Sequence, residues 1–159
     1  MLLGCYSYLF RPISQFGLNE TMVAAGTGAY GETLYPFRAY HNGDIIPGKG
    51  DPVARSCWVG YNGQEREKRD SFEMLTNPRN ANVQWVRKPS DGSFPGNAIP
   101  GGRSAEREPF YIGRCTIATP DNRVATIPGK IHRSASDGLY IVYGGVEYVC
   151  ADYDILVCQ

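Results

Sequence analysis

The sequence lacks an excess of charge of either sign. Its 159 residues include 16 lysines and arginines and 16 aspartates and glutamates, so the formal net charge at pH 7 is zero. Proteins that bind a polyanion such as DNA usually carry a cluster of uncompensated basic side chains. We therefore expect no nucleic acid partner.

Long apolar segments are also missing. The apolar start of the chain, residues 1–10, is much shorter than the roughly 20 residues that a membrane-spanning helix needs. It also lacks the basic region and the small-residue cleavage site of a secretory signal. We expect no transmembrane segment, and a protein that is cytoplasmic or is released without a signal peptide.

Cysteine and histidine are scarce, and their spacing fits neither a metal site nor a catalytic centre. No C-x-x-C pair occurs among Cys5, Cys57, Cys115, Cys150 and Cys158. The only histidines are His41 and His132, and no Ser-His-Asp or Cys-His arrangement can be assigned around them. We expect buried, reduced thiols in a reducing compartment, no metal, no cofactor and no enzymatic activity.

An apolar stripe at helical spacing is absent from every stretch of the chain, whereas aromatic and β-branched residues are frequent. Asn62-Gly63 and Gly144-Gly145 each separate two such strand-like segments. Two-residue loops of this composition supply the positive φ angles that a hairpin turn requires. The sequence therefore predicts an all-β protein with hairpins at both places.

Four landmarks occur twice in the same order, at residues 34–38, 46–49, 61–65 and 72–75 and again at 110–114, 127–130, 143–147 and 153–156. Tyr111 follows Tyr35 by 76 positions and Lys130 follows Lys49 by 81, so the second copy has gained five residues, between Ala118 and Ala125. This order predicts a tandem duplication that forms two pseudo-symmetric antiparallel β lobes. The repeats span residues 1–80 and 81–159 and pack as one compact unit, because each is too small to be comfortably stable alone.

The step Pro-Gly-Lys is part of both copies, as Pro47-Gly48-Lys49 and again at residues 128–130. Proline followed by glycine is typical of a type II turn. We predict such a turn in each copy, with the lysine ammonium directed by the turn.

These landmarks resemble a known family. Residues 101–114 (Gly-Gly, then Pro-Phe-Tyr-Ile-Gly-Arg), 128–131, 140–147 and 153–157 are similar to the DM-nine repeat of invertebrate proteins and natterin-like fish toxins. Tandem pairs of this repeat make up small mannose-binding lectins of molluscs, and here the resemblance covers residues 8–157, with a degenerate first copy. The resemblance implies a non-catalytic, metal-free all-β lectin, often a homodimer, that recognises mannose-type glycans in innate pattern recognition.

The family holds its sugar with a lysine of Pro-Gly-Lys and an aspartate of Gly-Gly-x-Asp. Lys49 and Lys130 match the lysine, but Gly28 and Ser104 stand at the aspartate positions. Substitute acceptors are present nearby as Glu32 in the first copy and Glu106 and Glu108 in the second. In an extended strand, residues 104, 106 and 108 share one face. We therefore hypothesise that Glu106 or Glu108 lies beside Lys130.

Other shared residues favour structural roles. Arg38 and Arg114 recur in both halves, where a carboxylate that holds the arginine ties one strand to its neighbour or one lobe to the other. Glu65 and Glu147 also recur.

A second function also fits the sequence. In this alternative, the chain is an intracellular structural or vesicle-associated interaction protein that has lost sugar binding. A glycan array distinguishes this function from that of a lectin.

Overall fold

The computed structural model describes residues 9–12, 21–134 and 138–159, and within them the protein is all-β, as predicted. The described residues contain no helix of the length and apolar character that crossing a membrane requires. The strands are β1 (Leu9–Pro12), β2 (Gly26–Thr27), β3 (Thr33–His41), β4 (Asp44–Asp51), β5 (Ser56–Tyr61), β6 (Gln64–Lys68), β7 (Phe72–Thr76), β8 (Val83–Arg87), β9 (Pro100–Arg103), β10 (Pro109–Ala118), β11 (Val124–His132), β12 (Gly138–Tyr143), β13 (Val146–Cys150) and β14 (Asp154–Cys158). Most of residues 1–10, the apolar start of the chain, lies outside the described residues.

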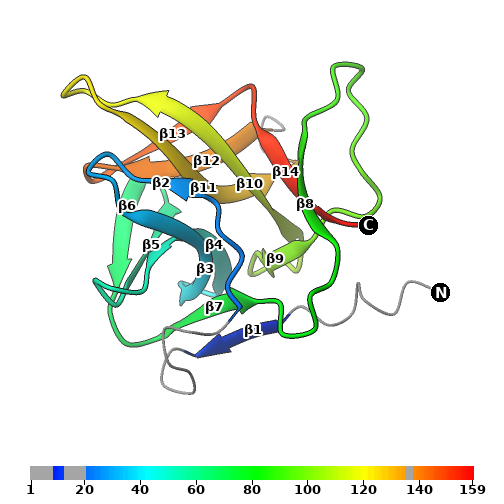
Figure 1. Ribbon diagram of the computed structural model, residues 1–159, viewed down its shortest axis with the longest axis horizontal. Coiled ribbons are helices and arrows are strands. Elements are labelled where there is room, and N and C mark those ends of the chain that lie inside the picture. The colour runs from blue at the N-terminus through cyan, green and yellow to red at the C-terminus, as the bar shows by residue number, and fades with distance from the viewer. Residues whose placement is uncertain (1–8, 13–20, 135–137) are drawn as a thin grey trace.

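The strands form one antiparallel sheet that closes on itself (Figure 1). Its order is β1-β7-β3-β4-β5-β6-β13-β12-β11-β10-β14-β8, and β9 pairs with both β10 and β4. Because β9 links these two strands, eight strands form a closed barrel, namely β4, β5, β6, β13, β12, β11, β10 and β9. The barrel therefore contains strands from both halves of the chain.

The two halves meet where β6 pairs with β13, at Val146 and Gln64. The contacts there are reciprocal. The amide of Glu65 donates to the carbonyl of Gly145 (3.1 Å), and the amide of Glu147 donates to the carbonyl of Gly63 (3.0 Å). Each carboxylate also accepts a bond from the opposite hairpin, from Gly145 N to Glu65 and from Gly63 N to Glu147, both 3.2 Å.

Both predicted hairpins are confirmed. β5 and β6 flank Asn62-Gly63, and β12 and β13 flank Gly144-Gly145. All four turn residues have positive φ angles, from 56° at Asn62 to 88° at Gly145. The turn composition therefore specified the backbone correctly.

The predicted Pro-Gly-Lys turns are wrong, because both segments are strands. Pro47, Gly48 and Lys49 lie within β4, and the second copy lies within β11. A Cβ on Gly48 would overlap the carbonyl of Trp58, and one on Gly129 would overlap that of Tyr140. Glycine is needed here for the close approach of a neighbouring strand and not for a positive φ angle.

Residues 104–108 form a turn and not the extended strand that the hypothesis about Glu106 and Glu108 required. The amide of Ser104 donates to the carbonyl of Glu108 (2.8 Å), and Arg107 has a φ angle of 69°. The first copy has the same turn, closed by the bond from Gly28 N to Glu32 O (2.7 Å). The alternation of faces in a strand therefore does not apply to these side chains.

The β10–β11 hairpin has a longer turn than the β3–β4 hairpin, in the segment where the insertion was predicted. Ile117 pairs with Ala125 across the β10–β11 hairpin, and the equivalent pair in the first half is His41 with Asp44. Residues 118–124 therefore replace the two-residue turn Asn42-Gly43. We call residues 118–124 the inserted turn.

The prediction of reduced thiols is wrong for three cysteines. Cys115 and Cys150 form a disulfide, with a Cα–Cα distance of 6.6 Å, and Cys158 is also disulfide-bonded. The bridge joins β10 to β13, which are not neighbours in the sheet, so the curvature of the barrel brings them together. Cys57 is free and fully buried. Of Cys57, Cys115, Cys150 and Cys158, only Cys57 is the buried, reduced thiol that was expected.

The predicted arginine ties between strands are confirmed. Arg38 Nε lies 2.9 Å from Glu73 Oε1, which links β3 to β7. Arg114 Nε lies 3.1 Å from Asp154 Oδ2, which links β10 to β14. Their carboxylate partners are the acidic residues of the fourth landmark in each copy, while Glu65 and Glu147 pair with lysines instead.

Candidate functional site

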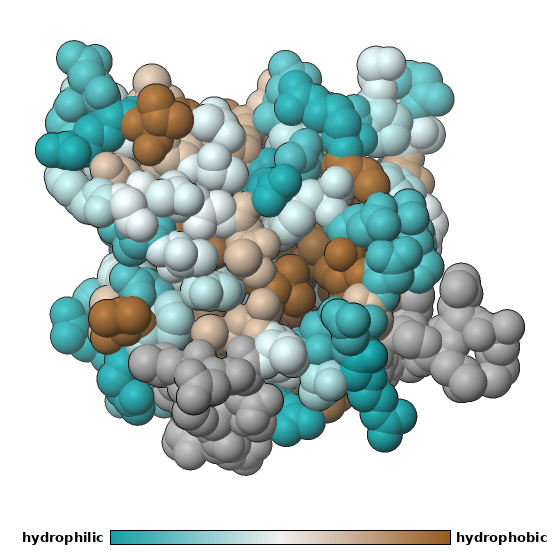
Figure 2. All heavy atoms as spheres, viewed as in Figure 1, coloured by the Kyte–Doolittle hydropathy of each residue, from teal (hydrophilic) through white to brown (hydrophobic). Residues whose placement is uncertain are grey.

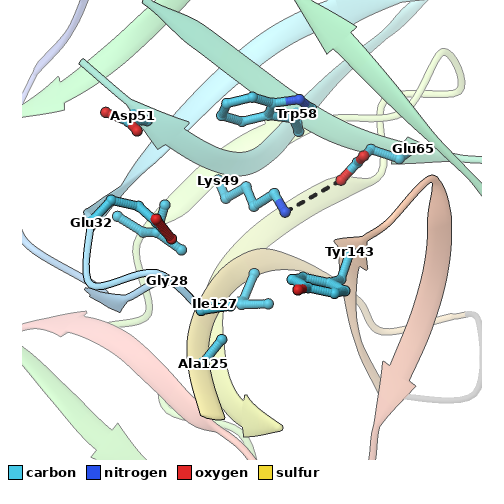
Figure 3. A pocket seen from close by; sticks show the side chains of 11 residues that line it. Gly28, Glu32, Lys49, Asp51, Trp58, Glu65, Ala125, Ile127 and Tyr143 are labelled. Carbon is cyan, nitrogen blue, oxygen red and sulfur yellow. Dashed lines mark ion pairs between the residues drawn. The ribbon is translucent and has the colours of Figure 1, made fainter. Parts of the chain in front are cut away.

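A cavity of about 280 Å³ lies beside Lys49, between the two halves of the chain (Figure 3). The turn before β3 forms one wall, β4 to β6 form a second, and β11 and β12 form a third. We call this cavity the Lys49 pocket. It is lined by Gly28, Ala29, Glu32, Leu34, Lys49, Asp51, Trp58, Glu65, Ala125, Ile127 and Tyr143.

The Lys49 ammonium lies at the centre of the pocket, between a carboxylate and two aromatic rings (Figure 3). Its Nζ is 3.3 Å from Glu65 Oε2, 5.6 Å from the Trp58 ring centroid and 5.3 Å from that of Tyr143. The ion pair does not have hydrogen-bond geometry, and Glu65 Oε2 is a buried oxygen without a hydrogen-bond partner. Such an acceptor is costly to leave unsatisfied. The pocket thus offers ammonium donors and an acceptor side by side.

Glu32 occupies the space of the side chain that Gly28 lacks. A Cβ built on Gly28 would overlap the carboxylate of Glu32. The tight turn from residue 28 to residue 32 explains this, since it folds Glu32 back over Gly28. A carboxylate is therefore present where the family resemblance places an aspartate, although it comes from a different residue.

Lys130 has the same carboxylate distance but a closed environment. Its Nζ lies 3.3 Å from Glu147 Oε2 and donates to the carbonyl of Gly60 at 2.7 Å. The rings of Phe110 and Tyr140 lie 5.5 and 5.6 Å away. The two lysine side chains are similarly buried, 10% exposed for Lys130 and 13% for Lys49, and what distinguishes Lys49 is the cavity that it lines.

The contacts found for the other candidates of the second copy are with residues other than Lys130. Ser104 is buried, and its Oγ accepts a bond from the amide of Glu108 (3.1 Å). Glu106 is exposed in the turn. Glu108 accepts bonds from the Ser134 hydroxyl (2.6 Å) and amide (3.1 Å). The carboxylate paired with Lys130 is Glu147, and within the described residues the structure shows no pairing of Lys130 with Glu106 or Glu108.

The contacts of Glu108 include a histidine. His132 Nε2 lies 3.0 Å from Glu108 Oε2 and 3.1 Å from Ser134 Oγ. The hydroxyl of Ser134, followed by His132, lowers the pKa of Glu108 below its ordinary value. A catalytic triad needs the serine and the acid on opposite ring nitrogens. Here both lie on Nε2, so this arrangement differs from that of a triad.

Sequence reasoning did not assign ligand contact to four polar or aromatic residues of the Lys49 pocket, namely Asp51, Trp58, Glu65 and Tyr143. Asp51 lies two residues after Lys49 on β4, and this spacing on a strand would have placed both side chains on one face. Tyr143 belongs to the other half of the chain, and no local pattern links it to Lys49. Within the described ranges, no group of three or more His, Cys, Asp or Glu side chains is arranged to hold a metal ion.

The protein-family model described as DM9 repeat matches residues 28–150. This match contains the Lys49 pocket in full and extends over well more than half of the chain. Among curated proteins, none matches the chain.

Proposed function

The chain belongs to the DM9 repeat family, and from this premise we propose that it is a non-catalytic carbohydrate-binding protein. We propose further that the Lys49 pocket binds mannose-type glycans and that the protein acts in innate pattern recognition. The observation that supports the proposal most directly is the position of the Lys49 ammonium. It is paired with the Glu65 carboxylate and lies between two aromatic rings, in the wall of a cavity.

The chemistry of this pocket suits a sugar. Each sugar hydroxyl can both donate and accept a hydrogen bond. Lys49 supplies donors, whereas Glu65 and Glu32 supply acceptors. Trp58 and Tyr143 present apolar ring surface, against which the C–H face of a pyranose can pack. The pocket thus combines the polar and apolar contacts that a hexose needs.

The finer features of the architecture also form part of the proposal. We propose that the two halves are pseudo-symmetric products of a duplication, as the matching strand order on either side of the β6–β13 contact suggests. We also propose that the protein works outside the cytoplasm, because disulfides such as the Cys115–Cys150 bridge persist in oxidising surroundings.

A homodimer is proposed on the family resemblance alone. Figure 2 shows several separate hydrophobic areas, set among hydrophilic side chains, on the described part of one face. A large protein interface usually has a continuous apolar patch. We therefore expect the dimer contact on another face.

A first prediction concerns Lys49 and Glu32. Lys49→Met should weaken binding of methyl α-mannoside by about tenfold or more, since charge-assisted bonds contribute roughly 1.5–3 kcal/mol each. Glu32→Ala should weaken it similarly, and the double variant Gly28→Asp/Glu32→Ala should restore binding, because it returns a carboxylate to the same space. Isothermal titration calorimetry measures the affinities, and a glycan array checks specificity.

Lys88→Met is the matched control, because Lys88 lies outside the Lys49 pocket and donates to the carbonyl of Ala151. An array signal that Lys49→Met leaves unchanged would contradict the proposal. A blank array for the unaltered protein, together with a specific protein partner, would favour the structural or vesicle-associated function instead.

A further inference from the structure

The inserted turn makes the Lys49 side of the molecule different from the Lys130 side. In the first half, Asn42-Gly43 closes the equivalent hairpin, and the next residue, Asp44, accepts a bond from Ala105 N of the 104–108 turn (2.7 Å). In the second half, the seven residues 118–124 take the place of those two. The Lys49 pocket therefore has a neighbour that the Lys130 region lacks.

Asp121 connects the inserted turn to two sides of the pocket. Its carboxylate accepts bonds from the hydroxyl of Tyr30 (3.2 Å) and that of Tyr143 (3.5 Å). Thr119, which is buried, also donates to it. Tyr30 lies in the turn between the pocket residues Gly28 and Glu32, and Tyr143 lines the pocket itself. The inserted turn thus holds both tyrosines at the rim.

Arg123 adds a cation to this rim. Its Nε lies 3.4 Å from Asp121 Oδ2, and its guanidinium lies 4.5 Å from the centroid of the Tyr30 ring. Tyr30 is 69% exposed, and the side chains of Arg123 and Asp121 are 51% and 46% exposed. The Asp121 carboxylate already contacts four protein groups, so it positions the rim, while the remaining guanidinium donors of Arg123 and the side chain of Tyr30 are held in solvent beside the pocket.

We propose that Tyr30, Asp121 and Arg123 form a second sugar subsite next to the Lys49 pocket. The protein would then recognise the terminal disaccharide of a glycan, with the first unit in the pocket and the second on this rim. Arginine carries five donors, of which the ion pair with Asp121 uses Nε. The inference rests on the proposed function, since it requires a sugar in the Lys49 pocket.

The test replaces residues 118–124 with Asn-Gly, the turn that the chain itself uses in the first half. The register Ile117–Ala125 then copies His41–Asp44, so the barrel should still fold, as circular dichroism and thermal unfolding can verify. Calorimetry with methyl α-mannoside and an α-linked dimannoside gives the affinities. The unaltered protein should bind the dimannoside about tenfold more tightly, by one or two additional hydrogen bonds. The shortened protein should bind the two sugars equally.

Point variants identify the residues without shortening the chain. Tyr30→Ala and Arg123→Ala should each remove most of the disaccharide preference but keep monosaccharide binding. Tyr40→Ala is the control, because Tyr40 is similarly exposed (64%) but lies on β3 outside the pocket. Equal affinities for both sugars in the unaltered protein, or a preference that survives the shortened turn, would overturn the second subsite alone. If the unaltered protein bound neither sugar, the proposed function would be overturned and this inference with it.

Discussion

At the scale of single residues, Lys49 and Lys130 show how neighbours decide what a side chain can do. Both ammonium groups lie 3.3 Å from a glutamate. Leu34 lies in the wall of the Lys49 pocket, while Phe110 stands at its equivalent position, 5.5 Å from Lys130. The larger ring and the carbonyl of Gly60 enclose Lys130. The same motif therefore gives an ammonium that lines a cavity in one half of the chain and one that donates to a backbone carbonyl in the other.

A prediction at this scale concerns pH and Glu108. Hydrogen bonds from Ser134 and His132 lower the pKa of Glu108 in the folded protein. The stability that they provide is therefore fully present above the unfolded pKa of about 4.3 and is lost as pH falls through the lower folded pKa. Glu108→Gln should lower the melting temperature at pH 7, and the difference from the unaltered protein should shrink towards pH 3.

Glu106→Gln is the control for this effect, because Glu106 is exposed in the same turn. Glu106→Gln should leave the melting temperature nearly unchanged from pH 7 to pH 3. A Glu108→Gln difference that stayed constant from pH 7 to pH 3 would show that the hydrogen-bonded carboxylate is not its source.

At the scale of elements, a glycine has one of two different roles. Gly63 and Gly145 have positive φ angles in hairpin turns. The preceding residues, Asn62 and Gly144, together with the flanking strand-like segments, indicate these turns from sequence. Gly48 and Gly129 lie in strands and allow another strand to approach. Proline before glycine was therefore a misleading turn signal in β4 and β11, because the requirement came from a strand distant in sequence.

The disulfide provides a prediction about elements. Cys115 and Cys150 are separated by 35 residues, so closing this loop in the unfolded chain contributes about 3–4 kcal/mol. The double variant Cys115→Ala/Cys150→Ala should lose about that much free energy of unfolding in urea, measured without reductant so that the bond of Cys158 remains in both proteins. An unchanged unfolding midpoint would mean that the bridge does not form in solution.

At the scale of the whole molecule, the barrel and the pocket both depend on the two halves together. β4, β5 and β6 come from the first half and β9 to β13 from the second. The pocket places Lys49 against Tyr143 and Ile127 of the other half. Neither half therefore contains a complete barrel or a complete pocket.

We accordingly predict that the complete chain unfolds in one cooperative transition and that residues 1–80 and 81–159 do not fold when expressed separately. Each isolated half would expose the strands that close the barrel, along with the apolar residues behind them. Circular dichroism during thermal unfolding distinguishes the outcomes. A sigmoidal transition from residues 81–159 alone would show instead that a repeat is an independent domain.

Much of the fold could be predicted because it depends on local chemistry. Asn62-Gly63 and Gly144-Gly145 adopt positive φ angles wherever strands flank them, so the hairpins were predictable. The repeated landmarks located the inserted turn, and the recurrence of Arg38 and Arg114 indicated the ties between strands. Glu106 and Glu108 were misplaced because a tight turn breaks the alternation of a strand.

The sequence by itself determined the strand content, the duplicated order of landmarks and the two lysines, because these follow from neighbouring residues and from spacing along the chain. The tertiary structure alone decided which lysine faces a cavity, how Glu32 covers Gly28, and that Cys115 meets Cys150. Each of these outcomes joins residues that become neighbours only after a turn folds back or the barrel closes. Closure depends on pairing distant strands, such as β4 with β9, which no short stretch of sequence records.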